Sequence, residues 1–135
     1  MADERGEARR TTRQLALVLA AVQASGTEHP TAERVFARVR RDLPRISLGT
    51  VYRNLQRLVS DGRIGALAHL RDRSLRYDPT APAHDHFVCE ACGHIDDLPA
   101  GTPPGGLAAA EHAGHAVTSH ALVLYGCCRT CRARA

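Results

Sequence analysis

The chain has 135 residues, of which 44% are hydrophobic and only 4% aromatic, so it suits one or two small domains with aliphatic cores. It has no run of about 18 apolar residues and no apolar stretch near its amino terminus, which predicts a cytoplasmic protein without a membrane span or signal peptide. All 18 basic residues are arginine: residues 1–78 hold 15 of them against nine acids, and residues 79–135 hold three against five. The basic first half suits a polyanionic partner.

Apolar residues at helical spacing predict three helices in the first half of the chain. The first is expected over 11–24, the second over 30–42 and the third over 48–61. Ser47 is the expected N-cap of the third helix, and Gly62 is its expected stop.

Two short strands over 63–70 and 74–77 are expected to follow as a hairpin. Three helices and a hairpin, in that order, are typical of a winged helix-turn-helix. A Pro-rich polar stretch comes next, which predicts a winged-helix domain over 1–78, a hinge over 79–83 and a second domain over 84–135. The overall fold class is therefore expected to be α+β.

Helix 48–61 is the expected DNA-reading element. Its outer face carries groups that reach phosphates and base edges: Thr50, Tyr52, Arg53, Asn54, Gln56 and Arg57. Composition alone fits an ordinary solvated helix face equally well. The basic charge of this half and the winged-helix order favour DNA.

The second half holds all five cysteines, four of which form two CxxC pairs. Cys89 and Cys92 make the first pair, and Cys128 and Cys131 make the second. Two such pairs predict a closed, structural tetrahedral zinc site, which would stabilise a small domain. Redox pairs or unrelated thiols are the alternative. Cys127 is interpreted as a free thiol, although it remains open as a substitute ligand for its neighbour.

A second group of metal-binding side chains surrounds the first cysteine pair. His84 and His86 are two residues apart and would share one face of a strand, and Asp96 and Asp97 follow on the expected next strand. Imidazole and carboxylate ligands suit Fe, Mn, Zn, Co or Ni.

Five motifs together resemble the Fur family of metalloregulators across nearly the whole chain. They are HPTAERVF at 29–36, ISLGTVYRNLQRLVSDGRI at 46–64, LRYD at 75–78, HDHFVCEACGHIDDL at 84–98 and YGCCRTC at 125–131. The resemblance implies a winged helix that binds an operator in double-stranded DNA and a small α/β domain that forms a homodimer through its sheet. It also implies structural zinc on the four CxxC cysteines and a short helix at about 107–113.

The resemblance further implies a regulatory metal between the domains. The matching ligands are His29, Asp78, His84, His86 and Asp97. Aspartate at 78 and 97 resembles the peroxide-sensing PerR branch, in which Fe(II) promotes oxidation of ligand histidines, here His29 and His84, whereas Mn(II) represses without sensing. Leu15 stands where relatives often carry Arg, so Arg13, Arg9 or Arg10 is expected to supply that DNA contact.

Several alternatives remain open at this stage. Within the family, an iron-responsive repressor is the main rival, and a zinc- or nickel-responsive regulator is less supported. Outside it, the histidine and carboxylate set would suit a mononuclear metalloenzyme. However, no nucleophile or base is evident, so no enzyme is expected. A zinc-stabilised interaction module without DNA binding is the third possibility.

Overall fold

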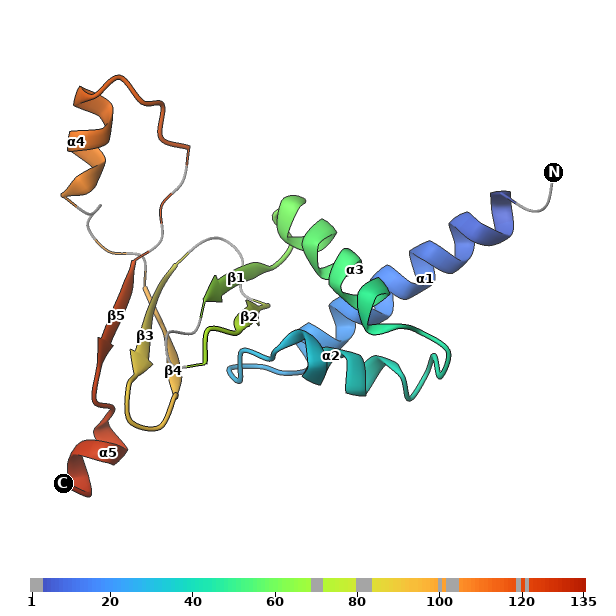
Figure 1. Ribbon diagram of the computed structural model, residues 1–135, viewed down its shortest axis with the longest axis horizontal. Helices are drawn as coiled ribbons and strands as arrows, with labels where there is room; N and C mark the ends of the chain where they lie inside the picture. Colours follow the sequence, from blue (N-terminus) through green and yellow to red (C-terminus); the bar gives the residue numbers. More distant parts are fainter. Residues whose placement is uncertain are drawn as a thin grey trace. The chain divides into compact units, whose positions relative to one another are not determined.

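The computed structural model describes residues 4–68, 72–79, 84–99, 101, 105–118, 120 and 122–135 (Figure 1). The chain divides into two compact units, Met1–Ala81 and Pro82–Ala135. Within the expected hinge over 79–83, only Pro79 is among the described residues. Residues 69–71 of the expected hairpin also lie outside them. Among the described helices, none has the length and apolar character needed to cross a membrane.

The first unit contains three helices followed by a two-stranded hairpin, in the order that the sequence predicts (Figure 1). The elements are α1 (Glu4–Gln23), α2 (Ala32–Val39), α3 (Leu48–Ser60), β1 (Gly65–Ala68) and β2 (Leu75–Asp78). The two strands pair antiparallel.

A single apolar cluster joins these elements. Val22 of α1, Val35 of α2 and Leu55 of α3 are completely buried in it, and Tyr77 of β2 is 1% exposed. Each helix thus turns one aliphatic stripe inward, which is how an amphipathic helix gains most of its stability.

The boundaries of the first two helices differ from the expected ones. Helix α1 begins at Glu4 rather than residue 11, because its first half is polar and lacks the apolar periodicity used to find helices. Helix α2 covers Ala32–Val39 rather than 30–42, because Thr31 is the N-cap and accepts a hydrogen bond from the Arg34 amide. Helix α3 has the expected Ser47 cap.

The second unit contains a three-stranded sheet and two short helices (Figure 1). The elements are β3 (Asp85–Cys89), β4 (Ile95–Leu98), α4 (Gly106–His112), β5 (Val123–Gly126) and α5 (Arg129–Ala133). Strand β3 is central, pairing antiparallel with β4 and parallel with β5. The mixed helix and sheet architecture agrees with the predicted fold class. The sequence did not predict β5 or α5, and α4 begins one residue before the expected helix.

Candidate functional site

Four cysteines converge at one end of the sheet in the second unit. Cys89 ends β3 and Cys92 lies in the turn that follows, whereas Cys128 is the N-cap of α5 and Cys131 lies within it. Their four Sγ atoms all lie within 4.8 Å of one another. Pairing of β3 with β5 therefore brings two CxxC pairs together that are far apart in the sequence.

The spacing and hydrogen bonding of these sulfurs fit a tetrahedral cation site. Zinc–sulfur bonds of about 2.3 Å in a tetrahedron place neighbouring sulfurs about 3.8 Å apart, and Cys92 Sγ lies 3.7 Å from Cys128 Sγ. The backbone N–H of Cys128 donates to Cys89 Sγ at 3.3 Å and is the main cause that lowers the pKa of Cys89 to about 6. Hydrogen bonds with the sulfurs of Cys128 and Cys92 raise the pKa of Cys131 to about 12. A cation among the sulfurs would offset the repulsion between four thiolates.

Cys127 does not belong to this group of sulfurs. Its side chain is exposed, and its thiol lies 3.8 Å from the carbonyl of Cys128. The sequence left open which of the two adjacent cysteines would be the ligand, and the cluster contains Cys128.

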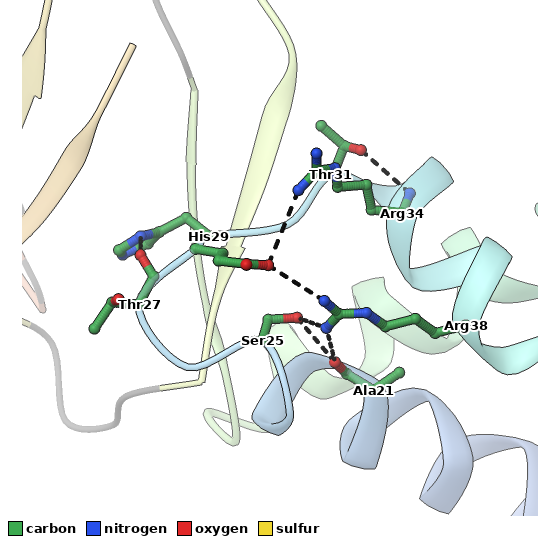
Figure 2. Close-up of polar contacts among 8 residues, drawn as sticks. Ala21, Ser25, Thr27, His29, Thr31, Arg34 and Arg38 are labelled. Carbon is green, nitrogen blue, oxygen red and sulfur yellow. Dashed lines mark hydrogen bonds and ion pairs between the residues drawn. The ribbon is translucent and has the colours of Figure 1, made fainter. Parts of the chain in front are cut away.

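In the first unit, a histidine and an aspartate form a buried pair. His29 precedes α2 and Asp78 ends β2, and their side chains are 0% and 1% exposed. His29 Nε2 lies 3.3 Å from Asp78 Oδ2. The ring points its other nitrogen, Nδ1, at the carbonyl of Thr27, 2.8 Å away (Figure 2). Because a carbonyl only accepts, Nδ1 carries a proton, and a cation bound at Nε2 would take the place of the proton that the Asp78 carboxylate otherwise requires there.

In the second unit, two histidines face one aspartate. His86 of β3 lies directly opposite Asp97 of β4, and His84 precedes β3 by one residue. The Nε2 atoms of His84 and His86 lie 3.0 and 3.3 Å from Asp97 Oδ1. Ligands about 2.1 Å from one cation lie about 3.0–3.4 Å apart, so the spacing within this group and within the His29–Asp78 pair suits metal ligation in each case.

A third histidine–aspartate contact differs in exposure. His94 Nε2 lies 2.7 Å from Asp96 Oδ1, but the two side chains are 52% and 56% exposed. Exposed ion pairs of this kind contribute little to the stability of the fold. Asp96, which the sequence grouped with Asp97, therefore lies with His94 and not with His84 and His86.

The first unit also carries a basic groove of about 1240 Å³ between α1, the loop after α2, and α3. Six arginines and two acids line it. The arginines are Arg9, Arg10, Arg13, Arg45, Arg53 and Arg57. The groove is therefore strongly positive, which suits a nucleic-acid backbone.

The expected DNA-reading residues have different environments. Thr50, Arg53, Asn54, Arg57 and Arg13 line the groove, whereas Tyr52 lies 38% exposed on α3. Arg53 donates to Thr50 Oγ1 at 3.0 Å, so these two side chains support each other.

The positions of Asn54 and Arg45 differ from those expected for the DNA-reading face. Asn54, which was assigned to the outer face, is only 7% exposed and donates to the Thr50 carbonyl. It lies three residues after buried Val51 and four before buried Leu58, a spacing that marks the inner stripe. Sequence reasoning missed Arg45, whose only signal is its place just before the cap of α3.

Comparisons with known proteins agree with this geometry. A model of the ferric uptake regulator family matches residues 7–125. The peroxide-responsive repressor PerR of Staphylococcus saprophyticus is 34% identical over 124 residues, which cover 91% of this chain and 82% of that protein. The crystal structure of the Campylobacter jejuni peroxide stress regulator is 26% identical, with a TM-score of 0.73 over 94% of this chain and 95% of that one. The Helicobacter pylori ferric uptake regulator Fur has the same fold, with 24% identity and a TM-score of 0.67 over 89% and 80% of the two chains. This chain belongs to the ferric uptake regulator family.

Proposed function

We propose that this protein is a metal-dependent, DNA-binding transcriptional repressor that senses peroxide. The observation that carries the proposal is the pair of histidine–aspartate groups, one on each unit, built from nitrogen and oxygen ligands only. In this proposal His29 and Asp78 join His84, His86 and Asp97 around one regulatory cation, Fe(II) or Mn(II). Zn(II) on the four clustered cysteines has a separate, structural role.

The two histidine–aspartate groups together offer five ligands. The first supplies two side chains and the second three, and all of them are nitrogen or oxygen donors that suit Fe(II) or Mn(II). A cation that uses both groups must select one orientation of the two units. Metal binding then favours the orientation in which the DNA-reading surfaces meet their operator, and metal and DNA raise each other's affinity.

The basic groove supports double-stranded DNA as the partner. Arg53 and Arg57 lie on α3, and Arg13 lies opposite on α1, so the groove presents bidentate donors from two helices. In this proposal polar side chains of α3 read base edges, while the arginines of the groove, Arg53 among them, bind phosphates.

A homodimer is proposed because β5 forms an edge of its sheet. Leu124 and Tyr125 on this strand are 47% and 40% exposed. An exposed apolar edge strand is a site at which a second copy can pair. A dimer would supply two reading helices for two half-sites.

Peroxide sensing is proposed from the ligand chemistry and from the similarity to a peroxide-responsive repressor. When Fe(II) is bound, it would supply the one-electron chemistry by which peroxide adds oxygen to a ligand histidine. His29 and His84 are the residues that we expect to be oxidised. Oxidation would remove a ligand, and the repressor would release its operator.

The test treats the Fe(II)-loaded protein with peroxide and measures the mass of the peptides that contain His29 and His84. We expect an added oxygen on one or both, with loss of DNA binding in a gel shift. The Mn(II)-loaded protein is the first control and should remain unmodified. His94, which makes an exposed pair with Asp96, is an internal control that should also remain unmodified. Unmodified His29 and His84, with DNA binding that still requires metal, would point to an iron-responsive repressor instead.

The metal site is tested with Asp97→Ala and the control His94→Ala. We expect Asp97→Ala to abolish metal-dependent DNA binding while one zinc per chain is retained, and His94→Ala to change neither. Zinc loss in Asp97→Ala would contradict the assignment of two separate sites. DNA binding of wild type that ignores a chelator sparing the thiolate zinc would refute the proposed function.

The DNA surface is tested with Arg53→Met and the control Arg41→Met, an exposed arginine after α2 that does not line the groove. Arg53→Met should weaken operator binding and reduce the salt slope of log K by about one for each phosphate that Arg53 binds in the wild type. Arg41→Met should change neither value. Equal effects of the two variants would contradict the groove as the binding surface.

A further inference from the structure

The segment between α1 and α2 holds His29 in an unusual backbone conformation. His29 has φ +50, which is the left-handed region that non-glycine residues rarely adopt, and its side chain is completely buried. Such a conformation persists only where surrounding contacts enforce it. The contacts on either side of His29 are therefore part of the site.

Arg38 of α2 makes these contacts on the amino-terminal side of His29. Its guanidinium donates to the Ala21 carbonyl at 3.3 Å and to the Ser25 hydroxyl (Figure 2). It also donates to Glu28 Oε2 at 3.2 Å, and Glu28 is the residue directly before His29. The planar guanidinium of Arg38 therefore links the last turn of α1 to Glu28, the residue before His29.

A backbone hydrogen bond holds the carboxyl-terminal side. The Tyr77 amide of β2 donates to the Pro30 carbonyl at 3.0 Å. Tyr77 directly precedes Asp78, so this bond brings the aspartate alongside His29. Arg38 therefore holds the chain before His29, and β2 holds the chain after it.

We propose that Arg38, acting through Ser25 and Glu28, is a positioning residue for the regulatory metal. It holds the segment in the conformation that directs His29 Nε2 at Asp78 and keeps Nδ1 on the Thr27 carbonyl. This inference rests on the proposed function, because it assigns His29 as a regulatory ligand. Loss of the hydrogen-bond partner of a metal-bound histidine lowers metal affinity by about 10- to 100-fold, and Arg38 holds the segment that supplies this partner, the Thr27 carbonyl.

A purely structural role for Arg38 is the competing explanation. Val18, Val22 and Val35 already pack α1 against α2 and are completely buried. Arg38 is 34% exposed on its side chain, so the helices do not depend on it for their apolar contacts. If Arg38 is a positioning residue, its substitution lowers metal affinity only when His29 is present. A purely structural role would not require His29.

The experiment measures Mn(II) affinity of the full-length, zinc-containing protein in Arg38→Met. We expect the Mn(II) Kd to rise by about 10-fold or more, with zinc content unchanged and DNA binding restored at saturating Mn(II). The matched control is Arg34→Met, since Arg34 lies 3.9 Å from the same Glu28 oxygen but is 69% exposed. Glu28→Gln replaces an exposed group and so should not disturb folding; it should raise the Kd less, in the same direction.

A double-mutant cycle with His29→Ala separates positioning from general stability. In the His29→Ala background, Arg38→Met should cause no further loss of Mn(II) affinity. An equal fold-loss in both backgrounds would overturn the proposal, and so would an unchanged Kd in both Arg38→Met and Glu28→Gln. If His29→Ala itself leaves Mn(II) affinity at the wild-type value, the proposed regulatory site fails rather than the role of Arg38.

Nitrogen NMR of His29 supplies a readout that a structural role would not move. In the metal-free wild type, Nδ1 should be protonated and bonded to the Thr27 carbonyl, and Arg38→Met should shift the Nδ1 signal towards that of an imidazole without this bond. An unchanged Nδ1 signal in a folded Arg38→Met protein would overturn the proposal.

Discussion

The two units of this protein are stabilised by different means. The first buries an aliphatic cluster contributed by α1, α2, α3 and the hairpin. Among the described residues of the second unit, the buried apolar side chains are Val88 and Ile95, accompanied by the sulfurs of Cys89 and Cys128. No described residue of α4 or α5 is buried. A unit with so small a core depends on its cysteine cluster, as small domains commonly do on a metal.

This difference in stabilisation matches the function proposed for each unit. A DNA-reading surface must keep its side chains in fixed positions, which a rigid apolar core provides. A metal-responsive unit can use ligand bonds both for its fold and for its signal. Substitutions in each unit test this division.

Loss of the cysteine cluster should unfold the second unit alone. Cys128→Ser removes one ligand but leaves a good N-cap residue at the start of α5, and a structural zinc site contributes about 10–16 kcal/mol to folding. Hydrogen exchange should show β3–β5 unprotected while α1–α3 retain protection, and zinc content should fall. Cys127→Ser is the matched control and should keep its zinc. Equal zinc loss in both variants would show that the two neighbouring cysteines were assigned wrongly.

A cavity in the first unit should reduce its stability without affecting zinc. Leu55 is completely buried among the helices, so Leu55→Ala should lower the free energy of unfolding by about 2–5 kcal/mol. Urea unfolding followed by helix signal measures the loss. Leu75→Ala, at a side chain 45% exposed, should change the free energy by less than about 0.5 kcal/mol. Zinc loss in Leu55→Ala would contradict the independence of the two units.

Removal of the α3 cap should have a smaller effect within the first unit. The Ser47 hydroxyl accepts the Thr50 amide at 3.1 Å, so Ser47→Ala should lower the free energy of unfolding by about 1 kcal/mol. Thermal unfolding measures the change. Because Ser47 Oγ also contacts Thr50 Oγ1, operator affinity should fall as well. An unchanged melting temperature would mean that packing alone maintains the start of α3.

The smallest expected effect concerns the hairpin turn. Hydrogen bonds from the Ser74 hydroxyl and amide, with a further contribution from Arg76, hold the pKa of Asp72 below its usual range. A carboxyl with a lowered pKa stabilises the fold above its unfolded pKa of about 3.9. That stability is lost as the pH falls through the folded pKa.

Carboxyl NMR titration of Ser74→Ala should therefore show a higher Asp72 pKa. Arg76→Met should raise it less, because Ser74 is the larger cause. Any stability difference between wild type and Ser74→Ala should be present at pH 7 and should shrink as the pH falls below about 3.9. A larger shift in Arg76→Met would reverse the assigned causes.

Much of the site could be predicted because its signals are local. The CxxC pairs, His84 and His86, and the cap at Ser47 each depend on neighbours a few residues away. Asn54 was misplaced although its spacing from Val51 and Leu58 carried the necessary signal. Arg45 carried only its place before the cap of α3, and Arg38 carried no signal, since their roles arise from contacts with distant parts of the chain.

Pattern and spacing predicted the winged-helix order and the candidate metal ligands, and short motifs carried the family resemblance, because helical periodicity and ligand chemistry are properties of short segments. Long-range packing was needed to select Cys128 over Cys127, to place Arg45 in the basic groove, and to join Arg38 to Glu28, the residue before His29. These outcomes depend on which strands pair and which helices meet. The free energy of those contacts belongs to the folded chain and not to any segment of it.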